Sequence, residues 1–189
     1  MHIAEAKLKS VSPYSQSKYI DPAQWPKLDK ELAKDWEARL WRERCHYDED
    51  GETFIPQMAF KNCLAEAAKY LSIQIPGKGK STYTKHFEAG VLVFEPLMLG
   101  VHKDDVLHEW LFVPSDGRPG GGSRVLKCFP LWPEWEGKVI FHVADDTITR
   151  DVFVTHLTQA GQFIGVGRFR PRNRGFYGRF VIDGEVKWS

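Results

Sequence analysis

Cysteine is scarce in this sequence, and its three cysteines, Cys45, Cys63 and Cys128, lie far apart with no C-x-x-C pair. An odd number at wide spacing supports neither a disulfide framework nor a cysteine-based zinc site. The histidines include no H-x-x-x-H or H-E-x-x-H pair, so the spacing of a helical metal site is missing too. The sequence therefore predicts a reduced protein with no metal and no cofactor.

Long apolar runs and a strong net charge are also absent. No stretch of about 18 apolar residues occurs, which predicts a cytoplasmic chain that does not cross a membrane. The formal net charge is only +1, so attraction to nucleic acid requires a local gathering of positive charge. With 42% hydrophobic residues, the chain can form a substantial core, and we expect a single domain spanning 1–189.

Hydrophobic periodicity predicts both strands and helices. Strands are expected at 3–11, 87–96, 107–117, 124–132 and 137–146, and helices at 27–45, 57–71 and 147–161. The residues expected to face the core from the second and third helices are Phe60, Leu64, Ala67, Ala68, Leu71, Val152, Phe153, His156, Leu157 and Ala160. This order is typical of an α+β fold: a ferredoxin-like or RNA-recognition-motif-like antiparallel sheet with two core helices and a helical insertion at about 22–46.

Two glycines mark expected chain reversals. Gly161 follows the last periodic residue of the third helix, so we expect it to end that helix in the left-handed conformation. Asp183-Gly184 lies between two short apolar stretches and predicts a tight hairpin.

The most unusual segment is the Gly/Arg-rich loop at 161–180. Within "GVGRFRPRNRGFYGRF" it carries five arginines, four aromatic residues and four glycines with no acidic residue. Arginine forms bidentate bonds with phosphate, and aromatic rings provide stacking faces for unpaired bases. Alternation predicts a hairpin with Phe169 and Phe180 in the core and the arginines facing a ligand, while a solvated arginine face remains the alternative.

A second basic segment, the loop at about 74–86, contains Lys78, Lys80 and Lys85. Contact with a phosphate backbone and simple solvation are both open for this loop. His46 and His86 lie near loops, where either is a candidate general base.

Two stretches together resemble a known family. "GQFIGVGRFRPRNRGFYGRF" is similar to the C-terminal glycine-rich loop of the RAMP superfamily, the RNA-recognition-motif-like subunits that form the backbone of CRISPR effector complexes. "GETFIPQMAFKNCLAEAAKYL" resembles that family's short strand, turn and helix, with Ile55, Pro56 and Lys61 at the matching positions. The resemblance implies a RAMP-like fold and binding of single-stranded RNA or DNA.

The resemblance also has departures. Some members of the family cleave target RNA with an aspartate in a loop roughly a dozen residues before the isoleucine-proline pair. Here "WRER" at Trp41–Arg44 stands there without an aspartate, and Asp48 and Asp50 belong to a turn, so we expect a non-catalytic protein. The compact layout resembles uncharacterised phage and prophage proteins, which implies a viral relative acting in a bacterial host cell.

The resulting site prediction combines both sources. The predicted nucleic-acid-binding residues are Arg168, Arg170, Arg172, Arg174, Arg179, Lys61, Lys78, Lys80, Lys85 and Tyr177, and the loop glycines are Gly165, Gly167, Gly175 and Gly178.

Three functions remain open at this point. The first is a non-catalytic binder of single-stranded nucleic acid that self-assembles along the strand. The second is an interaction protein that mimics or inhibits a host CRISPR or other defence complex. The third is a metal-independent endoribonuclease with His46 or His86 as its base.

Overall fold

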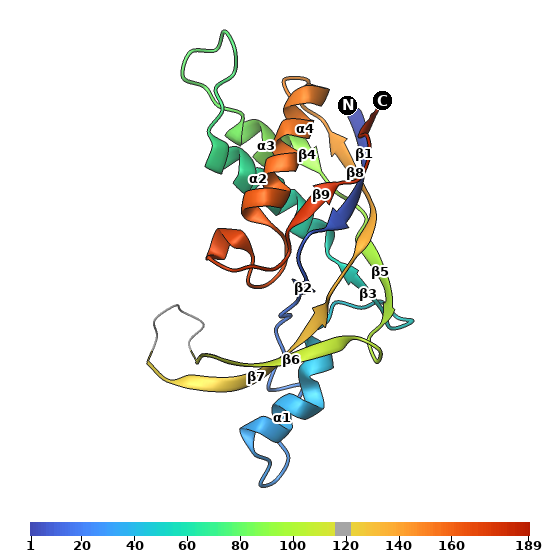
Figure 1. Cartoon of the computed structure of the whole chain (residues 1–189), viewed down its shortest axis with the longest axis vertical. Helices are drawn as coiled ribbons and strands as arrows, with labels where there is room; N and C mark the ends of the chain where they lie inside the picture. Colours follow the sequence, from blue (N-terminus) through green and yellow to red (C-terminus); the bar gives the residue numbers. More distant parts are fainter. Residues whose placement is uncertain (116–121) are drawn as a thin grey trace.

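The computed structural model describes residues 1–115 and 122–189, and its centre is a five-stranded antiparallel sheet (Figure 1). The strands of this sheet are β1 (His2–Ser10), β4 (Val91–Leu92), β8 (Glu136–Val143), β9 (Phe180–Ile182) and β10 (Lys187–Trp188). β1 pairs with β8 on one side and with β9 and β10 on the other, and β8 also pairs with β4. Both termini therefore lie at the same end of the sheet (Figure 1).

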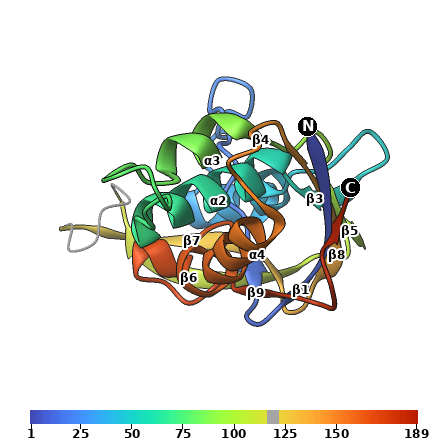
Figure 2. The same ribbon diagram turned by 90° about the horizontal axis from the view of Figure 1, so that it is seen from above.

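Two helices, α2 (Gln57–Leu71) and α4 (Arg150–Gln159), cover one face of this sheet (Figures 1 and 2). The chain order is β1, α2, β4, β8, α4, β9, and the strand order across the sheet is β9–β1–β8–β4. This combination is the split βαβ arrangement of the ferredoxin-like fold. The predicted fold class is confirmed.

The core lies between the sheet and the helices. On β1 the alternate residues Ala4, Ala6 and Leu8 are buried, as expected for a strand with one covered face. Phe141 of β8 packs edge-on against Phe153 of α4, with ring centroids 5.2 Å apart. The residues predicted to face inward are buried, except for the half-buried Leu71 and Val152.

Two insertions extend this core. The first, between β1 and α2, contains β2 (Tyr14–Ser15), α1 (Ala33–Leu40), the 3-10 turn η1 (Trp41–Arg44) and β3 (Glu52–Ile55). The second, between β4 and β8, contains β5 (Leu97–His102), β6 (Leu107–Pro114) and β7 (Arg124–Trp132). β2, β7 and β6 form one small sheet, β3 and β5 another, and α1 lies at the end of the molecule away from α4 (Figure 1).

The β6–β7 pair confirms the two strands predicted there, with Leu107 opposite Leu131 and Pro114 opposite Arg124. The sequence "GRPGGGS" at 117–123, whose glycines and proline are typical of a turn, joins these strands and lies mostly outside the described residues. Among the described residues, no helix combines the length and the apolar character needed to span a membrane.

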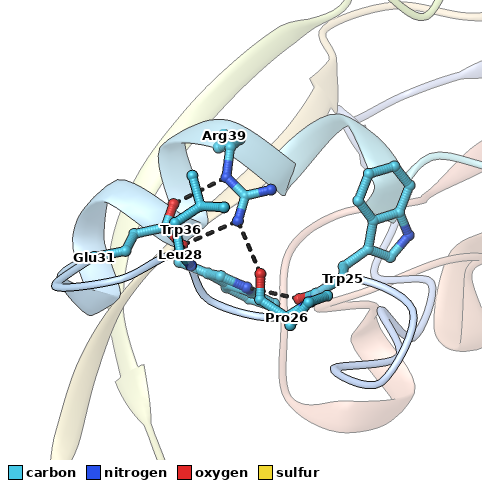
Figure 3. Close-up of polar contacts among 6 residues, drawn as sticks. All are labelled: Trp25, Pro26, Leu28, Glu31, Trp36 and Arg39. Atoms are coloured by element: carbon cyan, nitrogen blue, oxygen red, sulfur yellow. Dashed lines mark hydrogen bonds and ion pairs between the residues drawn. The ribbon is translucent and has the colours of Figure 1, made fainter.

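The helix predicted at 27–45 is shorter than expected, because α1 begins only at Ala33. Lys30 has a φ of +59°, which interrupts the helix, and Leu28 and Leu32 are 61% and 68% exposed instead of buried. The segment before α1 is held by polar bonds instead (Figure 3). Arg39 donates to both oxygens of Glu31 at 2.9 Å and to the carbonyl of Pro26 at 3.1 Å.

This arrangement predicts an acid-sensitive insertion. The hydrogen bond from Arg39 is the main reason that the pKa of Glu31 falls from its ordinary value of 4.5 to about 2. A carboxyl whose pKa is depressed on folding stabilises the folded form above its unfolded pKa and loses that contribution as pH falls toward 2.

We therefore expect the Trp36 indole N–H, which donates to the Trp25 carbonyl at 3.0 Å, to shift in NMR spectra between pH 4.5 and 2. The Glu31→Gln variant should show the altered indole signal already at neutral pH. An indole signal that is identical in both proteins across this range would contradict the prediction.

Two predicted elements differ at their ends. The strand predicted at 87–96 is wrong in its first part, where α3 (Thr84–Gly90) runs instead and only Val91–Leu92 is extended. Phe87 lies on this short helix and is fully buried. The first part of the apolar run thus contributes to the buried face of a helix, and only its later part is a strand. Gly161 does not end α4, because a π-helical turn, η2 (Ala160–Ile164), continues it to Gly165, whose φ is +71°.

The tight hairpin expected at Asp183-Gly184 is also wrong. β9 and β10 do not pair with each other, because both pair with β1: Phe180 lies opposite Ser10, and Lys187 lies opposite Glu5. Gly184 has a φ of +92° within the bend between them. The chain thus leaves the edge of β1 briefly and returns to it.

Candidate nucleic-acid interface

The arginine-rich segment forms a compact loop, which we define as residues 165–179 and call the Gly/Arg loop. It doubles back on itself, with the Val166 N–H donating to the Gly178 carbonyl and the Tyr177 N–H to the Phe169 carbonyl, both at 3.0 Å. The expected reversal of the chain is present, although no regular strand pairing forms within the loop.

Glycine is required where the two arms of the loop meet. Gly178 is buried with a φ of +73°, and a Cβ there would overlap the Val166 carbonyl. Gly167 has a φ of +78°, and a Cβ there would overlap the Tyr14 ring and the Ser15 carbonyl. A positive φ and such close approach both exclude a side chain. These two glycines therefore fit the loop against itself and against β2.

Backbone bonds fix the loop to the segment after β1. The Gly178 N–H donates to the Pro13 carbonyl at 2.7 Å, and the Arg168 N–H donates to the Ser15 carbonyl at 2.9 Å. The Arg179 N–H donates to the Ser12 hydroxyl at 3.0 Å. Both arms of the loop are thus attached to the first insertion.

Arg168 lies at the centre of a largely buried polar cluster. Its guanidinium donates to Glu109 at 2.6 Å, its Nε to the Ser15 hydroxyl at 3.1 Å, and its Cζ lies 3.8 Å from the Phe129 ring centroid. The Arg168 side chain is only 12% exposed. Burial lowers the pKa of Arg168, while Glu109 opposes that effect. The carboxylate of Glu109 thus compensates the positive charge of this arginine within the protein.

The same carboxylate also holds Tyr177. The Tyr177 hydroxyl donates to the second oxygen of Glu109 at 2.8 Å. Burial, followed by this hydrogen bond, raises the pKa of Tyr177. Its ring is therefore fixed, and only its exposed part is available to a ligand.

The other loop arginines differ in their surroundings. Arg170 donates to Glu66 of α2 at 3.0 Å and is partly buried, while Arg179 donates to the Gln162 carbonyl at 3.3 Å. Arg172 lies in a 3-10 turn, η3 (Pro171–Asn173), at the tip of the loop. Arg172 and Arg174 are exposed and form no ion pair with any residue in 1–115 or 122–189.

The inward position expected for Phe169 is wrong, because this side chain is 53% exposed and its φ is +58°. Strand alternation does not apply here, since the loop is irregular. Phe180, which lies on β9, is buried as expected and packs against Phe60, with ring centroids 6.2 Å apart.

A groove separates the Gly/Arg loop from the outer face of α2, and we call it the α2 groove. It consists of two hollows of about 410 Å³ and 300 Å³ that share Ala59 and Gly167 as lining residues. The positively charged residues that line it are Lys61, Lys69, Arg168 and Arg170, against the acidic residues Glu66 and Glu88. Arg168 and Arg170 are paired with Glu109 and Glu66. The two groove lysines face the single remaining carboxylate of Glu88, so the groove has a small local excess of positive charge.

The predicted basic loop lies apart from this groove. Lys78 and Lys80 are exposed in the connection between α2 and α3, which extends beyond the helices (Figure 1), whereas Lys85 is exposed on α3 itself. Figures 1 and 2 place this connection and the Gly/Arg loop on the same side of the molecule. Of the predicted lysines, the structure brings only Lys61 to the groove.

The two candidate general bases are separated. His46 lines the α2 groove, and burial, together with the nearby Lys18, lowers its pKa below the ordinary value, which favours the neutral imidazole. His86 does not line the groove; its Nδ1 lies 2.6 Å from an oxygen of Asp145. Only His46 therefore lies beside the groove arginines.

Three residues of this site were missed by sequence reasoning. Glu66 and Glu109 neutralise loop arginines from distant elements, and no sequence signal near the arginines identifies them. Lys69 lies two helical turns after Lys61, so the helical period places both on one face and was a usable signal.

No family model matches the chain, and no curated protein matches it either. Among the solved structures that are similar to it, two match over almost the whole of this chain. One is the cryo-EM structure of the type III-B Cmr-beta bound to cognate target RNA: a chain of it matches with a TM-score of 0.58 and 9% identity over 99% of this protein. This protein spans 60% of that chain.

The other is the crystal structure of Cmr6 from Pyrococcus furiosus. It matches with a TM-score of 0.50 and 15% identity, over 97% of this protein and 99% of Cmr6. The chain has a RAMP-like fold. The fold that the sequence resemblance implied is thus confirmed, while a phage origin stays a prediction.

Proposed function

We propose that this RAMP-like chain is a non-catalytic protein that binds single-stranded nucleic acid, with the phosphates of the strand in the α2 groove. The observation that carries the proposal is the groove itself: Lys61 and Lys69 line one wall, and Gly167 and Arg170 line the other. Backbone at a glycine lets a sugar-phosphate chain approach closely, and lysine ammonium groups attract its charge.

RNA is the favoured strand. One of the similar structures, that of the type III-B Cmr-beta, is described as bound to cognate target RNA, which supports the same class of ligand here. The separation of His46 from His86 favours binding over cleavage. Of these two candidate bases only His46 lines the groove, so the pair cannot act together as acid and base there.

The test is a comparison of two double variants with the same change of charge. Lys61→Ala with Lys69→Ala removes the groove lysines, whereas Lys9→Ala with Lys34→Ala removes exposed lysines of β1 and α1 that do not line the groove. Affinity for labelled single-stranded RNA and DNA is measured at several salt concentrations.

We expect the groove variant to reduce the slope of log affinity against log salt by about 1.4, since each phosphate contact contributes about 0.7 for a single strand. The control variant should leave the slope unchanged. A parent affinity that does not depend on salt, or equal losses in both variants, would overturn the proposal.

A further inference from the structure

A separate hollow lies between the Gly/Arg loop and β6, apart from the α2 groove. It has a volume of about 600 Å³, and Phe112 of β6 together with Phe169, Phe176 and Tyr177 of the loop line it. Phe112, Phe169 and Phe176 are 66%, 53% and 56% exposed, so these rings are not part of the core. We call this hollow the aromatic pocket.

The backbone of the loop keeps one of these rings outside the core at a conformational cost. Phe169 adopts a φ of +58°, a region that residues with a side chain rarely occupy. Such outliers persist where the surrounding structure imposes them, and they cluster at binding sites. Here the positive φ accompanies a ring that is exposed toward the pocket, so it does not improve core packing.

The aromatic wall is arranged before any ligand arrives. The Tyr177 hydroxyl is tied to Glu109, and the ring centroids of Phe169 and Phe176 lie 6.2 Å and 6.0 Å from that of Tyr177. Both pairs are inclined to each other, at 54° and 64°, which leaves ring faces open for a flat ligand.

The rim of the aromatic pocket is positive. Arg124, Arg174 and Asn173 line it, and among the described residues no acidic side chain does. Within the described residues neither arginine forms an ion pair. A flat apolar ring attached to a negative group matches this combination, whereas a purely aliphatic ligand leaves the arginines unused. An unpaired base with its phosphate has both properties.

The aromatic pocket and the phosphate site are lined by neighbouring residues of the loop. Arg168 lines the α2 groove, and the next residue, Phe169, lines the aromatic pocket. Consecutive Cα atoms are about 3.8 Å apart, so a single peptide of the loop joins a residue of the groove to a residue of the aromatic pocket.

We propose that the aromatic pocket holds an unpaired base of the bound strand, stacked on the loop aromatics and Phe112, with the adjacent phosphate paired to Arg174 or Arg124. This inference rests on the proposed function and adds base stacking to phosphate binding. Since every base has a flat face, the site accepts bases with little sequence preference.

The test uses two probes of equal length and charge: an oligouridylate and an abasic oligonucleotide with the same number of phosphates. Each is bound to the parent, to Phe176→Ala and to Phe94→Ala. Phe94 is a matched control, because it is 62% exposed and lies beside His142, away from the pocket. Removing the exposed Phe176 side chain leaves the core intact, which circular dichroism verifies.

We expect Phe176→Ala to weaken oligouridylate binding by about 5- to 140-fold, the equivalent of about 1–3 kcal/mol for one stacked base. Abasic binding should be unchanged, Phe94→Ala should behave as the parent, and Phe176→Trp should retain affinity.

Equal affinity of the parent for both probes, or an unchanged oligouridylate affinity in Phe176→Ala, would overturn the base pocket while leaving the phosphate groove standing. If the parent binds neither probe, the proposed function fails and the base pocket fails with it.

Discussion

Glu109→Ala is expected to destabilise the folded chain by about 2–3 kcal/mol, somewhat below the roughly 3–5 kcal/mol for breaking a fully buried ion pair. The substitution leaves the Arg168 guanidinium largely buried without its carboxylate and removes the acceptor of the Tyr177 hydroxyl. Both losses fall on the Gly/Arg loop. Chemical denaturation measures the change in stability, and hydrogen exchange measures the protection of the loop amides.

The matched control is Glu5→Ala. Glu5 also forms an ion pair, with Lys138 at 3.5 Å, but those side chains are 35% and 59% exposed. Exposed pairs contribute only about 0–1 kcal/mol, so this variant should unfold almost as the parent does. If Glu109→Ala and Glu5→Ala are equally stable, or if loop protection does not change, the cluster around Arg168 does not hold the loop.

Gly178→Ala is expected to displace the Gly/Arg loop and to weaken binding at both hollows. The new Cβ would overlap the Val166 carbonyl in a backbone conformation with a φ of +73°. The positive φ alone costs roughly 1–2 kcal/mol for a residue with a side chain, and the overlap adds to it. The loop arms must separate, which moves Gly167 and Arg168 from the groove.

Gly184→Ala separates the cost of a positive φ from the cost of steric overlap. Gly184 has a φ of +92°, but a Cβ there would meet nothing within 4 Å. This variant should therefore show only the cost of the positive φ, with normal binding of the labelled strand. If both glycine variants bind and unfold alike, close packing of the loop arms is not what positions the site.

Periodicity predicted the core well, because core packing imposes it. The spacing of Phe60, Leu64 and Ala68 on α2 and of Phe153 and Leu157 on α4 follows from one covered helical face, and the structure buries all of these residues. Prediction failed where tertiary contacts replaced local patterns. Leu28 and Leu32 have helical spacing but are exposed, because Glu31 and Arg39 organise that segment instead.

The arginines show the same limit. Their sequence pattern indicated five similar charges on one segment, yet Arg168 and Arg170 face carboxylates that are 59 and 104 residues away in the chain. Nothing local distinguishes them from Arg172 and Arg174. Composition identified the loop as unusual, while only the fold showed which arginines hold the loop and which have no carboxylate partner within 1–115 and 122–189.

The residues that hold Arg168 of the Gly/Arg loop come from the two insertions, outside the ferredoxin-like core. The sheet, α2 and α4 form a complete ferredoxin-like unit, but Ser15 belongs to the first insertion and Glu109 and Phe129 to the second. The two insertions therefore hold the Gly/Arg loop in place, although none of their strands belongs to the central sheet. A shortened protein that kept only the sheet, α2 and α4 would lose the contacts that position the Gly/Arg loop. A change in the length of either insertion is therefore expected to change the direction in which the loop presents its arginines, and with it the ligand of the proposed site.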